Sequence, residues 1–136
     1  MMKVGTTTTF EAAHRLPNHP GICARLHGHS YRVQVEAEGQ LDETGAVIWF
    51  EDLDDFVAGW ISETMDHRFI ASPEESPELL AAVPDHVICE TGDPTAENLA
   101  AWIGRRCLQL DRPDLKFAVK VWEIHGWGEC WAEWSS

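Results

Sequence analysis

The sequence lacks the features that mark membrane-spanning, secreted or disulfide-rich proteins. No apolar run approaches the roughly 20 residues that a membrane span needs, and the N-terminus lacks the charged-then-apolar layout of a signal peptide. The four cysteines include no C-x-x-C pair, which disfavours a disulfide framework and a four-thiolate zinc knuckle. We therefore expect a cytoplasmic chain with reduced thiols and no membrane partner.

Basic residues are scarce, with 10 Lys and Arg against 23 Asp and Glu and a net charge of −13. Such a charge disfavours a protein that binds nucleic acid or an anionic membrane through a broad basic surface. Residues 1–36 are the exception, because they carry four basic residues and only two acidic ones. An anionic small molecule would therefore bind most readily near the N-terminal third of the chain.

Internal repeats and Gly/Ser linkers are also absent, so nothing divides the chain. A length of 136 residues with 44% hydrophobic residues suits one globular unit with a buried core. We expect a single domain over residues 1–136.

Alternating apolar and polar residues predict strands, which bury one face of a sheet and expose the other. The clearest case runs from Tyr31 to Glu38, and another runs from Phe117 to Ile124. The β-branched run that ends at Phe10 and the segment from Cys130 to Trp134 complete the set, the latter as the second strand of a terminal hairpin.

Helical spacing of apolar residues predicts two amphipathic helices. One fits residues 52–65, and the other begins near residues 93–95, where Asp or Thr can cap the exposed amide groups. Three prolines lie in residues 66–93, which we interpret mainly as loop with a short helical turn at 77–82. The order β-β-α-α-β-β predicts an α+β fold, an antiparallel sheet with both helices on one face. Its other face would be left to solvent or to another subunit.

The motif His27-Gly28-His29 enters the clearest strand and is the strongest chemical signal in the chain. Residues i and i+2 of a strand point to the same side, so both imidazoles can converge on one metal ion. His14 follows the first strand, and an antiparallel hairpin would bring it beside His27. Three imidazoles with one open position are typical of a catalytic zinc site, although ordinary loop histidines are an equal alternative.

Three further candidates lie outside this trio. Cys23 is either a small buried hydrophobe or a thiolate that serves as a general base beside a metal. Asp66-His67 is either a polar helix end or a carboxylate that orients an imidazole for proton transfer. Glu123 shares a strand face with apolar residues, so it either reaches solvent at the strand end or binds a buried partner such as a heterocycle with N–H donors.

Taken together, several segments resemble the 6-pyruvoyl-tetrahydropterin synthase / 6-carboxy-tetrahydropterin synthase family. The resemblance rests on the segments Phe10–Leu16, Cys23–His29, Met65–His67, Pro94–Leu99 and Val119–Glu123, in the family's order over almost the whole chain. The spacing C-x-x-x-H-G-H is similar to that of the bacterial carboxy-tetrahydropterin synthases of the queuosine pathway. Trp49 and Ile124 depart from the family pattern, and residues 68–93 are longer than in compact bacterial relatives. The sequence does not assign a role to His125.

The resemblance implies the tunnelling fold (T-fold), in which subunits join edge to edge into barrels and form a homo-oligomer, usually a hexamer built from trimeric barrels. It implies Zn²⁺ bound by His14, His27 and His29, with Cys23 as proton acceptor. Proton relay and pterin anchoring would fall to Asp66, His67 and Glu123. Thr95 and Glu97 would also lie at the pterin. Local charge suggests four basic residues for the triphosphate of the substrate: Arg15, Arg25, Arg32 and Lys120.

The implied reaction converts 7,8-dihydroneopterin triphosphate to 6-carboxy-5,6,7,8-tetrahydropterin, acetaldehyde and triphosphate, in the biosynthesis of 7-deazapurines. The nearest alternative is a 6-pyruvoyl synthase, which eliminates triphosphate without cleaving the side chain. A three-histidine zinc hydrolase and a non-catalytic pterin-binding oligomer are the remaining alternatives.

Overall fold

The computed structural model describes residues 1–136 and contains one six-stranded sheet in the order β4-β3-β1-β2-β5-β6. The strands are β1 (Met2–His14), β2 (His27–Gly39), β3 (Arg68–Ala71), β4 (Val87–Ile88), β5 (Lys116–His125) and β6 (Gly128–Ser135). The four long strands pair with one another in the order β1-β2-β5-β6, and all three pairs are antiparallel, as the alternation predicted.

The two short strands correct the sequence interpretation. Residues 66–93 are mainly loop, as predicted, but they also contain two strands that the sequence did not reveal, because β3 pairs in parallel with β1, and β4 pairs in parallel with β3. The sheet is therefore mixed rather than wholly antiparallel. Strands of four and two residues are too short to produce a readable alternation, so only their tertiary pairing reveals them. The predicted helical turn within this segment is present as α3 (Pro77–Ala82).

The first predicted helix forms a continuous helical rod in three parts. These are α1 (Phe50–Leu53), the π-helical segment η2 (Asp54–Ala58) and α2 (Gly59–Thr64), and the joining residues keep right-handed helical dihedrals. The second helix, α4 (Ala96–Leu108), begins at Thr95, whose side chain accepts a hydrogen bond from the Asn98 backbone N–H. Thr95, and not Asp93, is therefore the capping residue.

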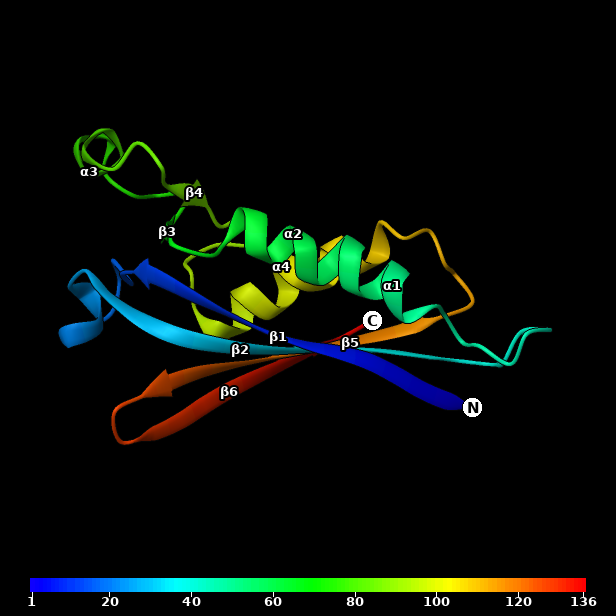
Figure 1. Ribbon diagram of the computed structural model, residues 1–136. Helices are drawn as coiled ribbons and strands as arrows, with labels where there is room; N and C mark the ends of the chain where they lie inside the picture. Colours follow the sequence, from blue (N-terminus) through cyan, green and yellow to red (C-terminus); the bar gives the residue numbers. More distant parts are fainter.

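Helices α1, α2 and α4 all cover one face of the sheet, and the other face carries no helix (Figure 1). Between these layers lies one cluster of 23 buried residues, which includes Tyr31 and Val33 from β2 and Leu99 and Ile103 from α4. Strand β6 packs against α4 through Trp134, whose ring lies against Gly104. A Cβ at position 104 would overlap this ring, so glycine is required for this close approach. None of the helices has the length and apolar character required to cross a membrane.

Candidate functional site

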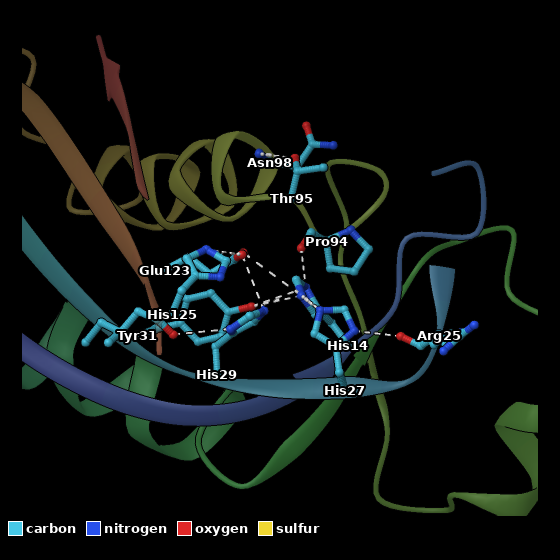
Figure 2. A network of polar contacts seen from close by, with 11 residues as sticks. His14, Arg25, His27, His29, Tyr31, Pro94, Thr95, Asn98, Glu123 and His125 are labelled. Atoms are coloured by element: carbon cyan, nitrogen blue, oxygen red, sulfur yellow. Dashed lines mark hydrogen bonds and ion pairs between the residues drawn. The ribbon is translucent and has the colours of Figure 1, made fainter. Parts of the chain in front are cut away.

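Three histidines converge on the helix-covered side of the sheet, at the ends of β1 and β2 (Figure 2). His14 pairs with His27 in the β1–β2 register, and His29 lies two residues further along the same face of β2. The Nε2 atoms of His14 and His27 are 3.1 Å apart, and the ligand atoms of the trio all lie within 4.8 Å of one another. The juxtaposition predicted from the hairpin is present.

Backbone carbonyls orient each of the three rings. The Nδ1–H groups donate to the carbonyl oxygens of Pro94 at 2.8 Å for His14, Arg25 at 2.6 Å for His27 and Ile124 at 3.3 Å for His29. Because each Nδ1 carries the proton, each Nε2 keeps its lone pair free. Outer hydrogen bonds of this kind are typical of metal-ligating histidines. Ile124 contributes through its backbone, so its departure from the family pattern leaves this contact intact.

Burial keeps the imidazoles of His14 and His29 in the neutral form that a metal ligand requires. The side chain of His14 is 2% exposed, and desolvation lowers the pKa of His14 to about 4. Burial likewise lowers the pKa of His29. The Nε2 atom of His29 is buried without any hydrogen-bond partner, which is costly unless a metal ion satisfies it. The donor set fits a zinc ion held by three imidazoles.

Glu123 reaches the same pocket from β5. Its Oε1 atom lies 3.3 Å from Nε2 of His29 and 3.1 Å from Nε2 of His125, and its Oε2 atom lies 4.0 Å from Nε2 of His14. The carboxylate is therefore held inside and does not reach solvent at the strand end, since its side chain is only 16% exposed. It can accept hydrogen bonds from a ligand in this pocket.

Sequence reasoning missed the role of His125. This residue lies two positions after Glu123 in β5, and its ring stacks on Trp127 with centroids 4.5 Å apart. Its Nε2 lies 3.1 Å from Oε1 of the Glu123 carboxylate, within ion-pair distance. The period of two along β5 was the available signal, because it assigns residues 123 and 125 to one face.

Cys23 lies in the turn between the first two zinc-ligand candidates, in the 3-10 helix η1 (Ile22–Ala24). The Cys23 side chain is partly exposed, and Cys23 is a free thiol. The carbonyl of Cys23 accepts a hydrogen bond from the backbone N–H of Leu16, just after His14. The turn is thus attached to the end of β1.

Of the other predicted substrate-binding residues, Thr95 and Arg25 adjoin the histidine site through the backbone carbonyls of Pro94 and Arg25, whereas no hydrogen bond or ion pair joins Glu97 to it. Thr95 follows Pro94, whose carbonyl orients His14, and its hydroxyl caps α4 (Figure 2). Glu97 is exposed in the first turn of α4. The side chain of Arg25 is exposed and forms no ion pair, so its guanidinium is free for a ligand.

Asp66 and His67 form a dyad that lies apart from the three histidines. The Nδ1–H of His67 donates to Asp66 Oδ2 at 2.8 Å, while Asp66 Oδ1 accepts from the backbone N–H of Glu11. This backbone hydrogen bond is the main reason why the pKa of Asp66 is lowered. His67 has a positive φ of 58°, and its side chain is 79% exposed.

The dyad borders a cavity on the face of β1 and β2 that lies opposite the side chains of His14 and His27. His67 lines this cavity of about 650 Å³ together with Glu11, Ala13, Gly28 and Ser30, and Ala12 and His29 also contribute to its lining. Glu11, Ala13, Gly28 and Ser30 alternate with the residues of the histidine face, so their side chains point to the opposite face of the sheet. Within one chain, no hydrogen bond or ion pair joins His67 to the histidine trio.

Comparisons with known proteins point to one enzyme family. A family model described as 6-pyruvoyl tetrahydropterin synthase matches residues 3–134. The 6-carboxy-5,6,7,8-tetrahydropterin synthase of Haemophilus influenzae is 36% identical over 90% of this chain and 93% of its own. The protein of the same name from Rickettsia bellii is 33% identical over 98% of this chain and 99% of its own.

A solved structure shares the fold. The 6-pyruvoyl tetrahydropterin synthase of Plasmodium falciparum superposes with a TM-score of 0.73, at 18% identity, over 99% of this chain and 98% of that one. With the tunnelling fold present and the family model matched from residue 3 to residue 134, the chain belongs to the 6-pyruvoyl tetrahydropterin synthase family.

Proposed function

We propose that the chain is a zinc-dependent 6-carboxy-5,6,7,8-tetrahydropterin synthase, a lyase that acts on 7,8-dihydroneopterin triphosphate. The observation that carries this proposal is the convergence of three Nε2 atoms whose rings are all oriented by backbone carbonyls, beside the held carboxylate of Glu123. Relatives above 30% identity that carry this name support the choice of reaction. The proposed setting is 7-deazapurine biosynthesis in the cytoplasm.

The residues divide the work as follows. The Nε2 atoms of His14, His27 and His29 would hold zinc, which would supply Lewis-acid polarisation of a substrate oxygen and so make the adjacent C–H more acidic. The Cys23 thiolate accepts the proton from that carbon. Glu123 accepts hydrogen bonds from the amino and ring N–H groups of the pterin.

Proton relay requires a histidine whose free nitrogen faces the substrate. The hydrogen bond from His67 Nδ1–H to Asp66 fixes the ring and leaves Nε2 free to exchange protons. Because this dyad lies on the opposite face of the sheet, we propose that it serves the site of a neighbouring subunit. The helix-free face and the uncovered edge of β6 support assembly into a homo-oligomer, since an unpaired strand edge is a site for association.

The proposal is tested by incubating the zinc-loaded protein with 7,8-dihydroneopterin triphosphate and identifying products by mass spectrometry. We expect 6-carboxy-tetrahydropterin and acetaldehyde, both lost in Cys23→Ala and in His27→Ala. Mixing Cys23→Ala chains with His67→Ala chains should restore part of the activity, because some sites then combine an intact Cys23 with an intact His67. The 6-pyruvoyl product would assign the sister activity instead, and the absence of any pterin product from the zinc-loaded wild type would refute both.

A further inference from the structure

A completely buried carboxylate lies outside the histidine pocket, in the loop between β3 and α3. The side chain of Glu75 is 0% exposed. Burying a carboxylate is costly unless it is paired and fully hydrogen-bonded. Glu75 lies in a short connecting loop and is not part of the hydrophobic core cluster, so its buried charge needs a specific partner.

Arg15 is that partner, in a two-pronged ion pair. The Nε–H of Arg15 donates to Glu75 Oε2 at 2.8 Å, and an Nη2–H donates to Oε1 at 2.9 Å. The backbone N–H of Ser76 donates to Oε1 as well. A fork of this kind fixes the guanidinium in one orientation, which a lysine could not reproduce. The pairing also lowers the pKa of Glu75.

The fixed guanidinium has a third hydrogen bond, to the turn that carries the thiol. An Nη1–H of Arg15 donates to the carbonyl of Ala24, the residue after Cys23, at 3.0 Å. The next residue, Leu16, donates its backbone N–H to the carbonyl of Cys23 itself at 2.8 Å. Two consecutive residues at the end of β1 therefore hold two consecutive carbonyls of the turn.

Hydrophobic packing cannot hold this turn in place. None of the three residues of η1 is buried, and the side chain of Ile22 is 73% exposed. Hydrogen bonds are thus the means by which the position of Cys23 is fixed relative to His14, which immediately precedes Arg15. The guanidinium of Arg15 is hydrogen-bonded to Glu75 and to the carbonyl of Ala24, so it is not free to bind a triphosphate.

We propose that Arg15 and Glu75, termed here the Arg15–Glu75 clamp, are positioning residues that hold the Cys23 turn in register with the histidine site. The consequence for catalysis rests on the proposed function, in which Cys23 accepts a proton. Misplacing such a group by about 1 Å can cost roughly a hundredfold in rate. Binding of the pterin, which relies on Glu123, should depend little on the clamp.

The test compares three clamp variants with a neighbouring control. Glu75→Gln keeps the shape but removes the charge, and Arg15→Lys keeps the charge but removes the fork. The double variant Arg15→Met/Glu75→Leu removes the clamp without leaving a buried unpaired charge, so it should fold. Glu74→Gln alters the adjacent exposed glutamate and is the matched control. The assays are steady-state kinetics with 7,8-dihydroneopterin triphosphate, zinc content, thermal unfolding and peptide-level hydrogen exchange over residues 17–26.

In the clamp variants we expect kcat to fall at least about tenfold with KM within about twofold and zinc content unchanged. Amide exchange over residues 17–26 should be roughly tenfold faster or more. The double variant should match the wild-type unfolding temperature and still show both losses, which a merely structural role would not produce. Wild-type kcat and exchange in a folded double variant would overturn the proposal. If the wild type itself makes no pterin product, the proposed function fails, whereas the exchange measurement still tests the clamp.

Discussion

The buried histidine at the end of β1 makes a quantitative prediction about the metal-free protein. Burial lowers the pKa of His14 to about 4 from an ordinary value of 6.5. Between these two pH values the unfolded chain binds a proton at this position and the folded chain does not. Stability therefore falls as the pH drops through 6.5, and the loss levels off below about pH 4.

Linkage converts these two pKa values into a free energy. Between pH 7.5 and pH 5, protonation of His14 in the unfolded state lowers the free energy of unfolding by about 2 kcal/mol. The variant His14→Asn removes the titrating ring and keeps an amide N–H that can donate to the carbonyl of Pro94. We expect its loss of stability over the same range to be smaller than that of the wild type by about 2 kcal/mol.

Urea unfolding after removal of metal by a chelator, at pH 7.5 and pH 5, measures this difference. The comparison isolates His14, because His29 remains in both proteins. His19→Asn, at an exposed loop histidine outside the cluster, is the control and should keep the wild-type pH dependence. Equal losses of stability in the wild type and in His14→Asn would refute the argument that burial keeps this ring neutral.

Two further predictions concern the zinc ligands and the cap of α4. The wild type should bind about one zinc per chain, and His27→Ala should weaken binding by more than the 10–100-fold that loss of an outer hydrogen-bond partner costs. Elemental analysis after dialysis against a chelator measures this, with His86→Ala as the control, and equal zinc retention in both variants would exclude the histidine trio as the site. Removing the capping hydroxyl in Thr95→Ala should cost about 1 kcal/mol in the free energy of unfolding, whereas Thr95→Ser should keep most of it. Urea midpoints of the two variants measure this difference, and indistinguishable midpoints would mean that the cap contributes nothing.

The sequence alone predicts the long strands and helices. Alternation over eight residues of β2 or β5 leaves one face apolar, and only a sheet with one buried face satisfies that pattern. The apolar stripe of α4 and its Thr95 cap likewise follow from local geometry. The π-helical segment η2 was not predictable in this way, since its spacing differs little from that of an α-helix over one turn.

The histidine site was predictable for the same reason. The spacing of His27 and His29 assigns both rings to one face of a strand, and an antiparallel hairpin needs only the register to bring His14 opposite. The same periodicity places His125 on the face of Glu123. The sequence alone does not show that the imidazole of His125 lies beside the Glu123 carboxylate.

Contacts between distant segments were decided by the tertiary structure alone. Strand β3 forms by pairing with the edge of β1, and β4 forms by pairing with β3, while the few residues of each strand contain no pattern of their own. The ion pair of Arg15 with Glu75 spans 60 positions, and an isolated glutamate in a loop looks the same whether it is buried or solvated. Local pattern in the chain therefore predicts which residues alternate, which face is apolar and which imidazoles share a strand, because these properties depend only on neighbouring residues. Tertiary structure decided the face on which Asp66 and His67 lie and the partner of Glu75, because these depend on where the chain returns after a long excursion.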